Sequence, residues 1–134
     1  MIRLPIPLLA LAVSVAPGVA EAAARIHCHT TYGGETRLHV ARPVASPYGV
    51  GSEPIGSHFL FRLVFEGQPR ELAAVKIYTY ADLDHGPVLI HQSTHPLPLT
   101  NRGAYGFTGL QRVYEPRRDS ELEYWCEVAR GGRK

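Results

Sequence analysis

The stretch Ser57–Glu66, SHFLFRLVFE, decides the fold class of this chain. Large apolar residues occupy every second position of it, namely Phe59, Phe61, Leu63 and Phe65. Successive side chains of a strand point to opposite faces, so this spacing predicts a β-strand with one wholly apolar face. The other face, with Leu60, Arg62 and Val64, is also largely apolar. The stretch therefore predicts a central strand that is covered on both sides.

Further runs with a period of two lie on both sides of this strand, and no segment shows a helical period. Turn signals rich in glycine, proline and aspartate separate the runs. The six further predicted strands are Arg25–Thr31, Glu35–Ala41, Leu72–Ala81, Val88–Thr94, Ala104–Tyr114 and Glu121–Ala129. The sequence thus predicts an all-β antiparallel sandwich of about seven strands, with an immunoglobulin-like topology as one option. A small β-barrel is the alternative.

Two segments depart from the regular strand pattern. Arg42–Gly56 is rich in proline and predicts no central strand, because proline cannot donate to a sheet. Gly106 and Gly109 predict a bulge inside the strand expected at Ala104–Tyr114. We expect no second domain, because the 134 residues show no internal repeat and suit a single core.

The first segment, Met1–Ala24, has the pattern of a secretory signal peptide. Arg3 supplies the positive start, Leu8–Ala16 the apolar region and Ala22-Ala23-Ala24 a small-residue cleavage site. The apolar run is shorter than the roughly 20 residues of a spanning helix, so we expect cleavage and no stable membrane insertion. Arg25–Lys134 is then a single exported β domain, periplasmic or secreted.

Cys28 and Cys126 lie near the two ends of this domain and predict one disulfide. Such a bond encloses nearly the whole domain, for which the chain-entropy model gives roughly 4–5 kcal/mol. The alternative is a thiolate metal site, because His27 and His29 flank Cys28. The C-x-x-C spacing typical of thiolate sites is missing, which favours the disulfide.

The last predicted strand has the clearest alternation. Its inward residues are expected to be Leu122, Tyr124, Cys126 and Val128. The outward residues are then Glu121, Glu123, Trp125 and Glu127. A tryptophan on a polar face is either covered by a loop or marks a contact surface, and the sequence leaves both readings open.

The hairpin between the first two strands has two candidate registers. A two-residue loop at Gly33-Gly34 pairs Cys28 with His39, a residue of the predicted polar face. A three-residue loop, Gly33–Glu35, pairs His29 with His39 instead. Only the second register keeps both faces consistent when Thr36, Leu38 and Val40 point inward, so we expect that register.

In the expected register His29 and His39 are neighbours on one face, with Cβ atoms about 5 Å apart. Together with His27 and a glutamate of the last strand they form a candidate site for Cu or Zn. A solvated histidine pair without any cofactor is the alternative. In that case mutual repulsion would disfavour protonation of both rings, which predicts a sensitivity to pH.

The surface composition points to binding rather than catalysis. The net charge of +2 is small for this length, which argues against nucleic-acid partners. The chain has no G-x-S-x-G motif, and both thiols are expected to be paired. The candidate contact residues are Trp125, Arg112, Tyr114, Arg117 and Arg118. We therefore expect a non-enzymatic binding or accessory module for a protein partner in the cell envelope or secreted fraction, with a metal-binding protein as the alternative.

Overall fold

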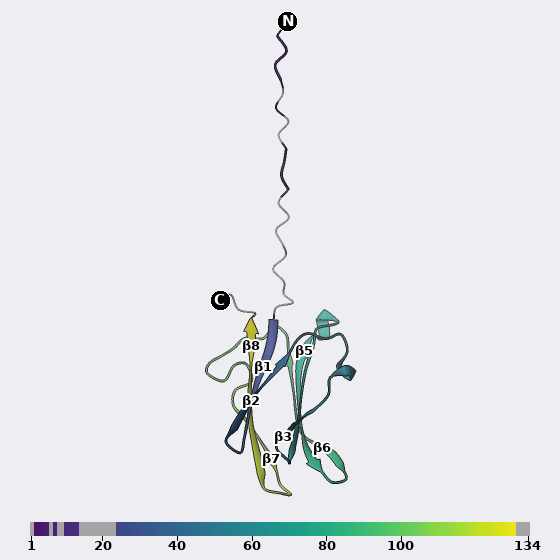
Figure 1. The fold of residues 1–134 in the computed structure, drawn as a ribbon, viewed down its shortest axis with the longest axis vertical. Coiled ribbons are helices and arrows are strands. Elements are labelled where there is room, and N and C mark those ends of the chain that lie inside the picture. Colours follow the sequence, from purple (N-terminus) through teal and green to yellow (C-terminus); the bar gives the residue numbers. More distant parts are fainter. Residues whose placement is uncertain (1, 6, 8–9, 14–23, 131–134) are drawn as a thin grey trace.

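A computed structural model describes residues 2–5, 7, 10–13 and 24–130 of the chain (Figure 1). Its strands are β1 (Ala24–Tyr32), β2 (Glu35–Ala41), β3 (Glu53–Ile55), β4 (Phe59–Glu66), β5 (Ala74–Leu83), β6 (Gly86–Pro96), β7 (Gln111–Glu115) and β8 (Ser120–Arg130). Short 3₁₀ turns cover Pro47–Gly49 and Arg70–Leu72. No helix in the described part of the chain is long and apolar enough to cross a membrane.

The predicted signal peptide lies mostly outside the described residues. Its described positions, 2–5, 7 and 10–13, belong to no helix or strand. Ala22 and Ala23 of the predicted cleavage site are not among them, whereas Ala24 is the first residue of β1.

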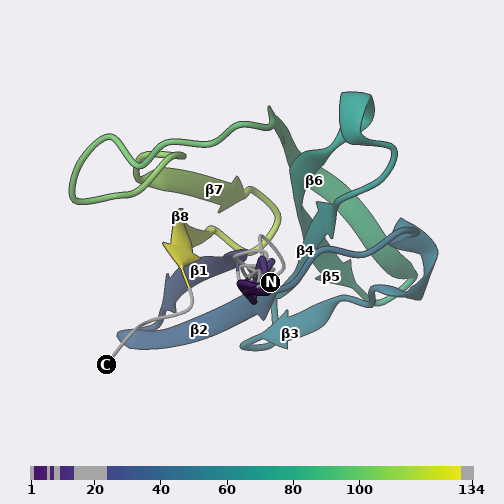
Figure 2. The same ribbon diagram turned by 90° about the horizontal axis from the view of Figure 1, so that it is seen from above.

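The eight strands form two antiparallel sheets, ordered β2-β1-β8-β7 and β3-β4-β5-β6. Figure 2 shows the two sheets side by side, with β2 next to β3 at one side of the sandwich and β7 next to β6 at the other. The predicted antiparallel sandwich is confirmed, and the sheets do not close into a barrel. The strand order also differs from that of an immunoglobulin domain, in which one sheet takes the first, second, fourth and fifth strands.

The core lies between the sheets and receives side chains from both. The strand that decides the fold, β4, is central in its sheet and contributes Phe59, Phe61, Leu63 and Phe65 as predicted. On its other face, Arg62 donates hydrogen bonds to the carbonyls of Val50 (2.8 Å) and Pro47 (2.7 Å). The proline-rich segment, which was predicted to hold no central strand, thus covers this face of β4.

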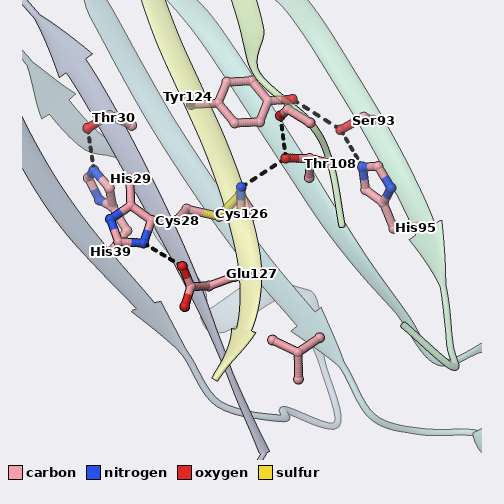
Figure 3. The surroundings of a disulfide bond; sticks show 12 residues. Cys28, His29, Thr30, His39, Ser93, His95, Thr108, Tyr124, Cys126 and Glu127 are labelled. Carbon is pink, nitrogen blue, oxygen red and sulfur yellow. Dashed lines mark hydrogen bonds and ion pairs between the residues drawn. A yellow bond between two sulfur atoms is a disulfide. The ribbon is translucent and has the colours of Figure 1, made fainter. Parts of the chain in front are cut away.

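The disulfide between Cys28 and Cys126 is confirmed. The two residues lie opposite one another on β1 and β8, their Cα atoms 4.1 Å apart, and both are fully buried. Figure 3 shows the disulfide between two groups of hydrogen-bonded side chains, Thr30 with His39 and Tyr124 with Ser93 and His95. The bond therefore joins adjacent strands of one sheet, and its loop encloses most of the domain.

The predicted register of the first hairpin is wrong. Gly33 and Gly34 form a two-residue turn, both with positive φ (59° and 79°), and Cys28 lies opposite His39. The inward and outward faces of β2 are consequently exchanged. Leu38 and Val40 point outward and are about half exposed, whereas His39 is buried. The disulfide fixes Cys28 inward, and the two-residue turn places His39 opposite it. His39 therefore points inward as well, because opposed residues of paired strands share a face.

Two further boundaries differ from the prediction. The strand expected at Ala104–Tyr114 is shorter, because residues before Gln111 form a loop that lies against β8. A short additional strand, β3, lies at the edge of its sheet and contains Pro54. Proline is tolerated at the edge of a sheet, because its missing N–H need not donate to a neighbouring strand there.

Candidate functional site

The outer face of the β2-β1-β8-β7 sheet carries a row of apolar and aromatic side chains. Leu38, His29 and Trp125 lie directly opposite one another on three successive strands. Val40 lies two residues from Leu38 on β2, and Tyr105 lies beside Trp125. We call these five residues the aromatic patch.

Stacking holds the centre of the aromatic patch in place. The rings of His29 and Trp125 are nearly parallel, with centroids 4.0 Å apart and an interplanar angle of 13°. His29 Nε2 lies 3.1 Å from a carboxylate oxygen of Glu127. The Tyr105 ring meets Trp125 edge-on at 5.9 Å. These contacts restrict the orientations of the three rings.

The patch is nonetheless open to solvent. Leu38, Val40 and Tyr105 keep 54%, 50% and 47% of their surface exposed, and Trp125 is half-buried. Tyr105 of the loop covers one edge of the Trp125 ring, as one of the two readings expects, whereas the contact-surface reading stays a prediction. An exposed group of large apolar side chains is typical of a contact surface.

The other predicted contact residues lie on β7 and at the turn that follows it. Arg112 lies on the outer face of β7, where its Nε is 3.1 Å from a carboxylate oxygen of Glu123. Tyr114 donates to Asp119 at 2.6 Å, and this hydrogen bond raises the pKa of the Tyr114 hydroxyl. The Arg117 side chain is exposed at the neighbouring turn.

Arg118 instead connects the two sheets. Its guanidinium donates to the carbonyls of Asp82 (3.0 Å) and His58 (3.1 Å) and pairs with Glu115 at 3.2 Å. Glu115 is buried, and burial alone raises its pKa. Hydrogen bonds from Arg118 and from the backbone N–H of Arg117 outweigh this and lower the pKa. We assign Arg118 to the structure rather than to a contact surface.

The predicted metal ligands are divided between the two faces of their sheet. His27 and His29 lie on the outer face, whereas His39 lies between the sheets. His39 Nε2 is 2.9 Å from the Thr30 hydroxyl, and Nδ1 is 2.8 Å from a Glu53 carboxylate oxygen. In the described part of the chain, no three ligand groups are close enough to hold an ion.

Three histidines connect the two sheets. His39 of β2 bonds to Glu53 of β3, and His91 of β6 lies 2.5 Å from the Tyr124 hydroxyl of β8. His58, just before β4, bonds to Ser120 of β8 at 2.6 Å. Burial lowers the pKa of His39 and of His91. Hydrogen bonds of these three imidazole rings thus link the two sheets of the sandwich.

A polar chain continues from His91 towards a cavity. Tyr124 lies 3.3 Å from Ser93, and Ser93 lies 3.2 Å from His95. Burial lowers the pKa of His95, and the neighbouring His91 lowers it further. His95 lines a cavity of about 260 Å³ together with Phe107 and the loop that follows β6. His91, Ser93 and His95 occupy every second position of β6, a spacing that the sequence shows. The sequence did not show that Tyr124 of β8 lies against them.

The described residues define a two-sheet β-sandwich with a cross-strand disulfide and an aromatic patch on one outer face. Comparisons with protein-family models, with curated proteins and with solved structures give no match for this chain. The sequence pointed to Trp125 but not to Tyr105, and its pattern predicted Leu38 and Val40 on the inward face. The glycine pair at 33–34 was the available signal for Leu38 and Val40, because two-residue hairpins commonly use such pairs.

Proposed function

We propose that this chain is an exported, non-enzymatic binding module that docks a protein partner on its aromatic patch. The observation that carries the proposal is the row formed by Leu38, His29 and Trp125, which is exposed and aligned across three strands. Aromatic side chains are enriched at protein contacts, and tryptophan and tyrosine are enriched among the few residues that carry most of the binding energy there. The stacked pair of rings reduces the entropy that is lost on binding.

Export is supported by two features of the sequence. The signal-peptide pattern of Met1–Ala24 directs a chain to the periplasm or medium, where disulfides form and persist. The Cys28–Cys126 bond fits such a compartment. The partner is then a component of the cell envelope or of the secreted fraction.

Photo-crosslinking in the source cell tests the docking site. A photoreactive amino acid in place of Tyr105 is expected to give one discrete protein adduct, which Trp125→Ala reduces strongly. The same group in place of Leu89 is the control, because Leu89 is 49% exposed on β6 of the other sheet. Identical adducts from both positions, or none from position 105, contradict the proposal.

The affinity of the captured partner gives the quantitative test. Trp125→Ala is expected to weaken binding about thirtyfold, which corresponds to a hot-spot loss of about 2 kcal/mol. Tyr114→Phe removes one exposed hydroxyl outside the patch and is expected to leave the dissociation constant unchanged.

Metal binding is the second candidate, in a form that no longer uses His39. Glu127 lies opposite His27 and bonds to His29, as expected for a last-strand glutamate beside the histidines. Binding would require the His27 ring to turn towards this pair. Calorimetry with Cu(II) and Zn(II) is expected to lose its signal in His29→Ala and to keep it in His39→Ala. No signal with the unaltered chain removes this candidate.

A further inference from the structure

Strand β2 is the edge of its sheet, and the direction of its backbone groups can be assigned. The two-residue turn makes Tyr32 and Glu35 a hydrogen-bonded pair. Hydrogen-bonded pairs then recur at every second position along β1 and β2, so Cys28 and His39 also form such a pair. The N–H and C=O groups of Thr36, Leu38 and Val40 consequently point away from β1.

The disulfide supports this assignment independently. A Cα separation of 4.1 Å between Cys28 and Cys126 is typical of a pair without mutual backbone bonds. The backbone of Cys126 bonds instead to Phe107 N and to the Thr108 hydroxyl, on the side away from β1. The backbone N–H and C=O of Cys28 therefore point to β2, where they bond to the backbone of His39.

No hydrogen bond between residues 24 and 130 uses the outward backbone groups of Thr36, Leu38 or Val40. The strand is also regular, with seven consecutive register pairs and no proline. Natural edge strands are usually protected against pairing by prolines, bulges or short length. Strand β2 has none of these three; its charged residues are Glu35 beside the turn and Arg37, whose guanidinium donates to the carbonyl of Pro54.

The other edge strands do have such protections. Strand β3 is three residues long and contains Pro54. Strand β6 has a register shift opposite Thr79 and Tyr80 and contains Pro87 and Pro96. Strand β7 has only five residues. The contrast singles out β2 as the edge that is open to another strand.

We infer that β2 pairs antiparallel with β2 of a second copy of this chain, centred on Leu38. Leu38 then faces Leu38 of the second copy, and Thr36 faces its Val40. All outward backbone groups of Thr36, Leu38 and Val40 find partners in this register. The pairs combine leucine with leucine and two β-branched residues, which stabilises neighbouring strands.

Charge also suits a second copy. In this register Arg37 faces His39 of the second copy, whose ring is bonded to Glu53. The Glu53 side chain is 59% exposed, so the guanidinium of Arg37, which donates to the carbonyl of Pro54 in its own chain, meets a second, accessible acceptor across the interface. The two sheets join into one, and the two Leu38–His29–Trp125 rows become continuous. This association does not depend on the partner proposed above.

Sedimentation velocity across a wide concentration range tests the association. The unaltered chain is expected to form a species of twice its mass. Leu38→Lys places two ammonium groups opposite each other and is expected to weaken the dimer at least tenfold. Leu89→Lys is the matched control, because Leu89 is exposed to a similar extent on the other sheet. A chain that stays monomeric at every concentration overturns the inference.

A backbone-directed variant and hydrogen exchange keep the test independent of side-chain effects. Leu38→Pro removes one outward N–H and no bond to β1, so folding by near-UV circular dichroism is expected to persist while the dimer is lost. In the dimer, the amides of Thr36, Leu38 and Val40 are expected to gain protection with rising concentration. The amides of Arg37 and His39 already bond to β1 and are expected to stay constant.

Equal protection of all five amides, or a dimer that Leu38→Pro leaves intact, overturns the pairing. Trp125→Ala is expected to leave the dimer intact, because Trp125 lies two strands from β2. Absence of the dimer with crosslinks retained at position 105 would contradict this inference alone. A dimer without crosslinks at position 105 would contradict the proposed function alone.

Discussion

Gly106 forms a bridge between the loop before β7 and Cys126 of β8. A Cβ at this position would lie 2.1 Å from the carbonyl oxygen of Cys126 and 2.7 Å from its carbonyl carbon. Both are backbone atoms next to the buried disulfide, so they cannot move aside easily. The loop carries Tyr105 into the aromatic patch, and Gly106 is thus a requirement of the candidate site.

Gly106→Ala is expected to lower the free energy of unfolding by about 2–5 kcal/mol, because positive φ and overpacking both penalise alanine. Gly33→Ala is the matched control, since Gly33 has a similar φ of 59° but no atom within 4 Å of the added Cβ. Chemical denaturation of both variants measures the difference. Equal losses would show that the close approach to Cys126 contributes nothing.

At the scale of elements, a side chain completes the edge of β8. Strand β7 pairs with β8 only as far as Tyr124. Beyond that point, Asn101 donates to the carbonyl of Val128 (3.0 Å) and accepts from its N–H (2.9 Å). One amide thus replaces two backbone bonds of a missing strand, and it fixes the loop that covers Trp125.

Asn101→Ala is expected to accelerate hydrogen exchange of the Val128 amide about fivefold, since one hydrogen bond contributes about 1 kcal/mol. Asn101→Asp keeps the acceptor and is expected to give a smaller acceleration. The Leu122 amide, within the part of β8 that pairs with β7, is the internal control and should not change. A uniform change along β8 would point to global destabilisation instead.

At the scale of the whole molecule, buried histidines make the sandwich sensitive to acid. Burial lowers the pKa of His91 in the folded chain below its ordinary value of 6.5. Burial also lowers the pKa of His39. The Glu53 carboxylate raises this pKa, whereas the positive charge of Arg37 and the neighbouring His29 lower it further, and the net shift is downward. Below pH 6.5 the unfolded chain therefore binds more protons than the folded chain.

The free energy of unfolding is expected to fall as the pH decreases from 7 through the lowered pKa values of these histidines. Urea denaturation at a series of pH values measures the slope. His91→Gln is expected to reduce it, because the glutamine side chain does not titrate. His85→Gln, at the exposed β5–β6 turn, serves as the control. An unchanged slope in His91→Gln would remove His91 from the explanation.

The disulfide acts on the same scale, because 98 positions separate its two cysteines. Cys28→Ala combined with Cys126→Ala is expected to lower the free energy of unfolding by roughly 4–5 kcal/mol in the chain-entropy model. Denaturation of the double variant and of the oxidised chain measures this loss. A difference below about 1 kcal/mol would show that the closed loop contributes little.

Much of the fold could be predicted from local patterns. The alternation in β4 and β8 identified both strands and their inward faces, because burial of one face is written directly into a period of two. The disulfide followed from two cysteines alone. Of the candidate site, only Trp125 and His29 were placed on the correct outer face.

The remaining parts depend on contacts between distant segments. Arg118 was assigned to a surface cluster, yet it binds carbonyls of Asp82 and His58 across the sandwich. The segment before Gln111 was assigned to a strand, yet it lies against β8 as a loop. Neither outcome is visible in a window of ten residues, because the acceptors belong to other elements.

By itself, the sequence determined the all-β class, the alternation of the central and last strands and the pairing of the cysteines. Only the tertiary structure decided which face of β2 is buried. Local hydrophobicity favours Leu38 and Val40 inside, but the covalent bond of Cys28 and the two-glycine turn impose the opposite face. A covalent constraint and a fixed turn register outweigh the burial of two side chains, and this inversion places Leu38 beside His29 and Trp125.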